Sequence, residues 1–528
     1  PAYAGLLGSE AVRCYRRYGA SPLYALEIEL RDVQHYIDSD KPEDINKALK
    51  IISSVNEQQK NDTSWKDSLL FGQFTLWKGI AEFWKDNFDE AIDSLKEGWR
   101  IFITYDEQQD LVYLAENWIG YVSYRKADFV EAEYWMKISL EGLIDLLSKE
   151  LDNKKRKRNL QQRIQYSLGN LAILYRYTGR FIEAIRYAEM ALNIVQSLPR
   201  NKKEILRSLN TLSHVLAIAG RNIDARHYLE EAKRIYKEIP DRLLGGRVYS
   251  NFCQLSYGTM EFAHLIEYYR AEELHKAVEN SSGTHVQKYI DYAEKAIDLL
   301  EKEPVFHKEL ADAYFSLGEL YMMMPANHPA IQKKGDKWEL AEQAFEKALE
   351  SAKKSQFQYR VIDTLESLVT LYYFQSQTVN LSPDQKRMCE EKQKQRQNEI
   401  EEDWKIQQFP NLAGRYELTQ GDIHFDKALE FLKEEYPKAD NSALGVQNLL
   451  KAFTHYANSA AYKKKFNINR HYLMLRVIYN RLDKLVELAH PLSFLRLESL
   501  DYQRQEAPRE EPLISRRALS LLAQDHIA

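Results

Sequence analysis

The sequence predicts an all-α fold, a right-handed superhelical solenoid built from antiparallel pairs of helices. Four segments carry the same pattern: a small residue, a turn seven or eight positions later, and an alanine just inside the next helix. The alanines recur at intervals of 41, 52 and 41 residues, at Ala91, Ala132, Ala184 and Ala225. Glycine and proline are scarce, with 20 and 14 copies in 528 residues, which argues against a β-rich fold with many turns.

Each copy of the pattern predicts one helix–turn–helix unit. Two helices approach closely only where side chains are small, and the first helices carry such residues at Gly79, Gly120, Ala172 and Ser213. Aromatic side chains fill the space beside three of the turns, at Phe88, Phe129 and Phe181. Gly179 and Gly220 suit the left-handed exit from a first helix. Because one pair cannot bury both of its faces, the pairs must stack into a continuous array.

These residues resemble the tetratricopeptide repeat. The best match is the set Leu168, Leu171, Ala172, Tyr175, Gly179, Phe181, Ala184, Ala188 and Ala191. A second match has a longer turn, at Gly318, Tyr321, Trp338, Ala341, Phe345 and Ala348. The period near 41 exceeds the usual 34 residues of the family, which implies longer helices or longer connections. The likeness covers residues 25–375 well and residues 411–490 loosely.

The pattern divides the chain into five expected parts. They are N-terminal helices with a first degenerate repeat (1–64), the main array (65–375), a charged helical or mobile insertion (376–410), degenerate C-terminal repeats with a cap (411–490) and a weakly ordered tail (491–528). Two further insertions lie inside the array, at 142–160 and 322–337. The first contains the basic run Lys154–Arg158, which we interpret as a solvated helix extension or loop, the alternative being a nuclear-import or nucleic-acid patch.

Charge and composition restrict the partners. The 73 basic and 78 acidic side chains leave a net charge of −5, so no nucleic-acid partner is expected. No segment has the apolar length of a membrane span and no secretory leader is visible, so we expect a cytoplasmic protein without a membrane partner. Cys14, Cys253 and Cys389 lie too far apart in sequence to form a disulfide framework. We expect Cys253 to be a buried structural thiol and Cys389 to be exposed.

No motif predicts catalysis. The sequence lacks a phosphate-binding loop, a His-Glu-x-x-His zinc motif and a Gly-x-Ser-x-Gly nucleophile elbow. The pair His264 and His275 lies eleven residues apart, too far along a helix to share one metal ion. We therefore predict a non-enzyme with no catalytic residue, no metal and no cofactor.

In the family that the repeats resemble, the first helices line a concave groove. Transferred position by position, the resemblance implies a groove for a protein or peptide ligand formed by Trp77, Trp84, Asn117, Tyr121, Tyr124, Arg125, Asn170, Arg176, Tyr177, Asn210, His214 and Asn251. Asparagine amides can hold the backbone of an extended peptide, and aromatic and arginine side chains can anchor it. The alternative is that these residues, and the neighbouring Phe83 and Trp118, pack against the next repeat.

Two functional hypotheses follow. The segment from Tyr416 to Phe425, followed by Ala452-Phe453 and Tyr456-Ala457, looks like the C-terminal repeats of bacterial signal-transduction ATPases with numerous domains. That likeness implies a sensor or regulatory arm of a larger signalling or defence protein, with an upstream nucleotide-binding module outside this chain. The alternative is a stand-alone scaffold or adaptor that binds an extended peptide in its groove. A fused caspase-like protease is excluded, because the chain after Asp501 is short and has no cysteine.

Overall fold

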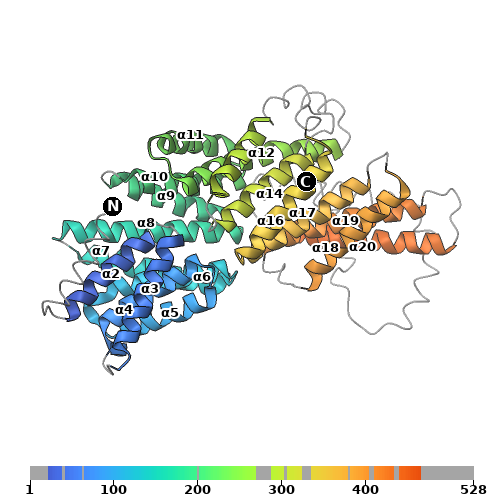
Figure 1. Cartoon of the computed structure of the whole chain (residues 1–528). Helices are drawn as coiled ribbons and strands as arrows, with labels where there is room; N and C mark the ends of the chain where they lie inside the picture. The colour runs from blue at the N-terminus through green and yellow to red at the C-terminus, as the bar shows by residue number, and fades with distance from the viewer. Residues whose placement is uncertain are drawn as a thin grey trace, which may run out of the picture. The chain divides into compact units, whose positions relative to one another are not determined.

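The computed structural model describes eleven segments of the chain, all of them largely helical (Figure 1). They are residues 22–38, 42–61, 65–150, 152–198, 201–268, 287–302, 306–323, 334–377, 381–402, 409–432 and 439–464. None of these segments contains a strand. The chain forms two compact units, the first made of residues 1–419 and 458–475 and the second of residues 420–457 and 476–528. The predicted all-α solenoid is confirmed.

Antiparallel pairs of neighbouring helices form the first unit. The N-terminal helices are α2 (Pro22–Asp38) and α3 (Pro42–Gln59), followed by the short η1 (Trp65–Asp67). Four regular pairs follow, namely α4 (Leu69–Trp84) with α5 (Phe88–Phe102), α6 (Gln109–Arg125) with α7 (Phe129–Lys149), α8 (Lys154–Tyr177) with α9 (Phe181–Ser197), and α10 (Lys202–Ile218) with α11 (Asn222–Glu238). The short η2 (Asp106–Gln108) precedes α6.

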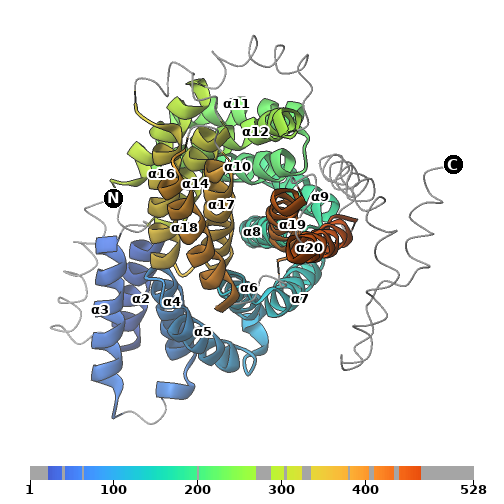
Figure 2. The same ribbon diagram turned by 90° about the vertical axis from the view of Figure 1, so that its right-hand side faces the viewer.

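The array continues with less regular spacing. Its next elements are α12 (Arg242–Tyr268), a helix over residues 287–300, α14 (His307–Met323) with α16 (Lys337–Lys354), and α17 (Gln358–Ser376) with α18 (Pro383–Glu402). The last described helices are α19 (Pro410–Leu432) and α20 (Ala439–Lys464). Within the first unit the first helices of successive pairs contact one another, as α6 with α8, α8 with α10, α10 with α12, α12 with α14 and α14 with α17. Figure 2 shows α6, α8, α10 and α17 on the inner side of the array and α7, α9 and α11 on its outer side.

Most turns inside the pairs share one backbone conformation. Gly179 and Gly220 have φ angles of 78° and 79°, as their left-handed exit requires. In each turn, the N–H of the residue after the left-handed one donates to the carbonyl five residues earlier. Arg180, for example, donates to the carbonyl of Tyr175 at 2.8 Å. Two equivalent turns place a residue other than glycine in this region, at Asp86 and Ala127, and the turn that joins α16 to the next pair does so at Gln356. The turn geometry is thus imposed by the packing of the pair and is not set by glycine alone.

Close contact between the two helices of a pair occurs at the predicted small residues. A Cβ atom added to Gly120 would lie 2.7 Å from Met136 Cγ and 3.0 Å from the carbonyl oxygen of Ala132. The corresponding contacts for Gly79 are 2.7 Å to Leu95 and 2.9 Å to the carbonyl of Ala91. Two neighbouring core clusters, one over α2–α6 and one mainly over α6–α9, fill the space between the helices. The repeat pattern therefore marks the points where the backbones meet.

The insertions at 142–160 and 376–410 are largely helical where the structure describes them, the first as extensions of regular helices and the second as a helix of its own. The extra residues of segment 142–160 lengthen α7 to Lys149 and begin α8 at Lys154, so the run Lys154–Arg158 forms the first turns of α8 and is largely exposed. Segment 376–410 contains α18, which packs on α17. The expected insertion 322–337 and the expected tail lie largely or wholly outside the described residues.

The expectation that Cys389 is exposed is wrong. Its side chain is 6% exposed, and it shares one face of α18 with the buried residues Gln393 and Ile400. These positions are four and seven residues apart and therefore lie on one side of a helix, the side that packs on the rest of the array. The sequence did not reveal these three buried positions, because most of the residues around them in α18 are charged. The expectation for Cys253 is confirmed, because that thiol is fully buried.

Substituting alanine at two glycines tests the close approach of the helices. Gly120→Ala should destabilise the protein by about 1–3 kcal/mol, because the methyl group overpacks the contact with α7. Gly169→Ala, also in a helix of the array, is the matched control: nothing lies within 4 Å of its added Cβ, so better helix propensity should stabilise the protein by about 0.5–1 kcal/mol. Urea unfolding measures both values. A stabilising Gly120→Ala would contradict the packing described here.

Candidate functional site

The inner side of the first unit is closed by contact between repeats that are far apart in sequence. Arg125, at the end of α6, donates a hydrogen bond from Nη2 to the carbonyl of Ser355, 3.2 Å away and 230 residues along the chain. The same Nη2 forms an ion pair with Asp86 at 3.1 Å. Its guanidinium lies over the rings of Phe88 and Phe357, at 5.0 and 5.9 Å from their centroids. We call these five residues the closure contact.

Aromatic side chains extend the closure contact onto α8. Phe357 is fully buried, with its ring centroid 6.0 Å from that of Tyr124 and 5.5 Å from that of Tyr177. Tyr359 packs edge-on against Tyr177 at 4.6 Å. The predicted groove residues Tyr124, Arg125 and Tyr177 are therefore brought together, but they are covered by the turn between α16 and α17.

The predicted asparagines form a ladder between successive first helices. Asn170 donates from Nδ2 to Asn117 Oδ1 at 3.3 Å. Asn251 donates from Nδ2 to the carbonyl of Asn210 at 3.0 Å, and Asn210 donates to the carbonyl of Leu244 at 3.3 Å. Asn117, Asn210 and Asn251 are buried, whereas Asn170 is partly exposed. Of this series, Asn170 keeps the most access to solvent.

The remaining predicted aromatic residues lie against the first core cluster. Trp77, Trp84 and Tyr121 are all partly buried there. Tyr121 contacts the ring of Phe83 at 5.2 Å and Trp84 contacts it edge-on at 5.5 Å. Each of these three side chains thus combines packing with partial exposure.

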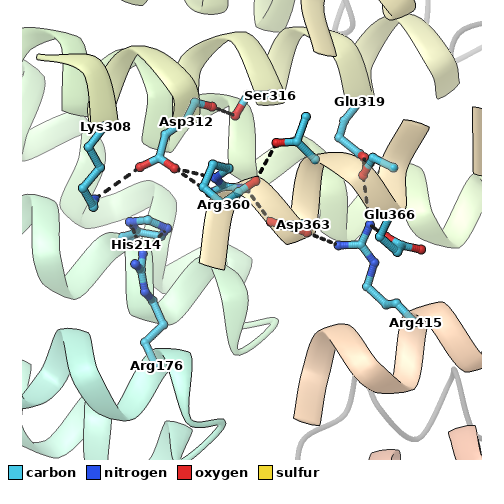
Figure 3. A network of polar contacts seen from close by, with 12 residues as sticks. Arg176, His214, Lys308, Asp312, Ser316, Glu319, Arg360, Asp363, Glu366 and Arg415 are labelled. Atoms are coloured by element: carbon cyan, nitrogen blue, oxygen red, sulfur yellow. Dashed lines mark hydrogen bonds and ion pairs between the residues drawn. The ribbon is translucent and has the colours of Figure 1, made fainter. Parts of the chain in front are cut away.

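Sequence reasoning missed a band of buried charges on the inner helices α14, α17 and α19 (Figure 3). Asp312 lies between Lys308, at 3.5 Å, and Arg360, at 2.6 Å. Arg360 also pairs with Asp363 at 2.5 Å, and Asp363 pairs with Arg415 at 2.7 Å. We call these residues, together with Glu366 and Glu319, the charge band. A signal was present in the sequence, since Arg360, Asp363 and Glu366 recur every three residues in an otherwise apolar helix.

Burial and pairing act in opposite directions on the carboxyl groups of the charge band. Burial alone would raise the pKa of Asp312, but Arg360 and Lys308 outweigh it and hold that pKa below its usual range. At Glu319 burial dominates and raises the pKa to about 7, although Arg415 and a 2.7 Å hydrogen bond from Ser367 oppose it. The band therefore contains one carboxyl group that is partly protonated near neutral pH.

Arg176 and His214, both predicted to face inward, contact each other across α8 and α10 (Figure 3). A guanidinium nitrogen lies 2.6 Å from the imidazole ring. The pKa of His214 is lowered well below its ordinary value, first by burial and then by Arg176, Lys308 and Arg360, against the opposing effect of Asp312. The imidazole is therefore neutral near pH 7 and accepts the hydrogen bond from Arg176.

The comparisons with known proteins agree with the repeat architecture. Residues 163–238, which span most of α8 through α11, match the family model of the tetratricopeptide repeat. The fold is that of a tetratricopeptide-like helical solenoid. No curated protein sequence matches the chain.

Several solved structures resemble it. A Rap protein complexed with competence and sporulation factor is 15% identical, with 84% of this chain and 99% of that chain covered and a TM-score of 0.48. The Rap conjugation gene regulator of plasmid pLS20, in complex with the Phr* peptide, is 17% identical, with coverages of 64% and 76% and a TM-score of 0.40. The apo form of the quorum sensor NprR from B. thuringiensis is 11% identical, with coverages of 85% and 97% and a TM-score of 0.39.

The described segments also contain neither a candidate membrane span nor a candidate metal site. None of their helices combines the length and apolar character that crossing a membrane requires. None of their histidine, cysteine or carboxylate side chains form a group of three or more that could hold a metal ion.

The pH dependence of stability should report on the closure contact. Burial raises the pKa of Asp86 to about 6, against the lowering effect of Arg125, while Glu309 adds to the rise. Between pH 4 and pH 6, roughly, the folded protein keeps a proton that the unfolded chain has lost, so Asp86 lowers stability as pH rises through this window. Asp86→Asn should remove that part of the pH dependence, and asparagine tolerates the left-handed φ of 59°.

The partner variant Arg125→Gln should act in the opposite sense. Losing the cation that lowers the pKa of Asp86 widens the window, so the variant should be less stable by about 3–5 kcal/mol at pH 7.5, with a smaller deficit at pH 5. Urea unfolding at both pH values measures the difference from wild type, and Arg186→Gln, on the exposed side of α9, is the control. An equal loss of unfolding free energy at both pH values would show that the pKa of Asp86 does not depend on Arg125.

Proposed function

We propose that this chain is a regulatory solenoid that binds a protein or peptide segment on the inner side of its first unit. The single observation that carries the proposal is the state of Asn170. Its Nδ2 donates to Asn117, and within the described residues its carbonyl oxygen has no partner. Because the side chain is partly exposed, it can offer one acceptor and one further donor to the backbone of an extended ligand.

Other partly exposed side chains lie on neighbouring first helices. Tyr121 on α6, His214 on α10 and Arg247 on α12 are all partly exposed. Arg247 keeps a 33% exposed side chain although it pairs with Glu309 at 2.7 Å. Aromatic and arginine side chains are the groups that most often anchor ligands at protein interfaces.

The regulatory part of the proposal rests on the closure contact. The turn at 355–357 covers one part of the inner side, so a ligand bound next to it will favour whichever arrangement of the turn fits it better. A sensor arm of a larger signalling protein needs such a response, whereas an adaptor needs binding alone. An upstream nucleotide-binding module, if the full protein has one, would receive this response.

Peptide capture tests the binding proposal. The full chain is mixed with an equimolar library of synthetic octapeptides, separated by gel filtration, and the retained peptides are identified by mass spectrometry. Asn170→Ala should reduce retention about tenfold, because the loss of one or two hydrogen bonds weakens binding by roughly 1–1.5 kcal/mol. Asn193→Ala, at an exposed position of α9, should leave retention unchanged. Retention of no peptide by the wild type, or equal retention by both variants, would exclude the inner side as the binding face.

A further inference from the structure

Arg176 is a buried cation that forms no ion pair within the described segments, although the Asp312 carboxylate acts on it at longer range. Its side chain lies over the ring of Tyr177, 4.0 Å from the centroid, and the residue is 7% exposed. Its hydrogen-bonding partner is the neutral ring of His214. No carboxylate pairs with it anywhere in the described segments, and its Nε also lacks a partner there. A buried guanidinium in this state is destabilising unless an anion reaches it.

The other arginines on the inner side provide the contrast. Arg125 pairs with Asp86, Arg247 with Glu309, and Arg360 and Arg415 with the carboxylates of the charge band. Lys308, the remaining cation near His214, shares Asp312 with Arg360. Among these inner cations, Arg176 has no carboxylate within ion-pair distance in the described segments. The partly exposed His214 lies directly next to it.

We propose that the ligand places a carboxylate against Arg176, where it replaces His214 as the partner of the guanidinium. Carboxylates match the planar donor geometry of arginine and form charge-assisted hydrogen bonds that a neutral imidazole cannot equal. The ligand is then an acidic peptide, which contributes an aspartate, a glutamate or its own C-terminal carboxylate. This inference depends on the proposed peptide binding and adds to it the chemical class of the ligand.

The test compares two octapeptide libraries of the same composition, one with free C-termini and one with amidated C-termini. Wild-type protein should retain peptides in which Asp and Glu are enriched over Asn and Gln by about tenfold, or should prefer the free C-termini by a similar factor. The first result assigns the carboxylate to a side chain and the second to the chain end. Arg176→Gln should abolish the preference while other peptides are still retained, and Arg186→Gln should keep it.

The outcomes separate this inference from the proposed function. Peptides retained by wild type without any preference for acids would overturn the inference and leave the proposed function standing, whereas no retention at all would overturn both. Arg176→Gln should melt no lower than wild type in the absence of peptide, because it removes an uncompensated charge. If that variant does not fold, Arg176→Lys replaces it: lysine keeps the charge but not the paired donors, so the acid preference should fall about threefold to tenfold. An unchanged preference in a folded Arg176 variant would also overturn the inference.

Discussion

The close approach of two helices within each pair is the constraint on which the rest of this structure depends. At Gly79 and Gly120 the backbones are so near that an added methyl group would lie about 3 Å from the carbonyl of the facing alanine. That contact fixes how the second helix crosses the first, and the shared left-handed turn follows from it even where the residue is Asp86 or Ala127. Once each pair has one geometry, stacking turns every pair relative to the last and the array must curve. The curvature brings Ser355 to Arg125.

The sequence predicted the contacts within and between neighbouring helix pairs. It did not predict the closure contact, which joins repeats that are far apart in the chain. The spacing of the alanines locates the helix pairs, because each alanine marks a contact between the two helices of one pair. It also places Arg176 and His214 on adjacent first helices, and these residues do contact each other. The closure contact was beyond reach, since the angle between successive pairs is a property of side-chain packing and small angular differences accumulate over 230 residues. The charge band was missed for a different reason. Because its charges pair with one another, they can be buried on a helix face whose other residues are apolar and predict a hydrophobic core.

Buried and mutually paired charges line part of the inner side. The paired carboxylates and guanidinium groups of the charge band contribute little to stability, because the cost of desolvation offsets most of their attraction. Its effect is to hold side chains such as Arg360 and Arg415 in one arrangement, each satisfied by a neighbour on another helix. Against such a background, an unmatched group stands out chemically. The neutral His214 cannot balance the charge of Arg176, and the acidic ligand proposed above would do so, although the whole chain carries a net charge of −5.

The closure contact and this position are linked through a single helix. Tyr177 packs against Phe357 and Tyr359 at the covered part of the inner side, while the preceding residue, Arg176, reaches towards α10. Two consecutive residues at the end of α8 therefore serve the two features, and a change in the position of that helix end alters both. A carboxylate that drew Arg176 away from His214 would also remove the guanidinium from the ring of Tyr177, which packs on Phe357 and Tyr359. If ligand binding shifts the closure equilibrium by some factor, linkage requires that closure shift the affinity for the ligand by the same factor. A solenoid with only an open groove has no contact between distant repeats through which such a coupling could act, whereas here Tyr177 packs against Phe357 and Tyr359.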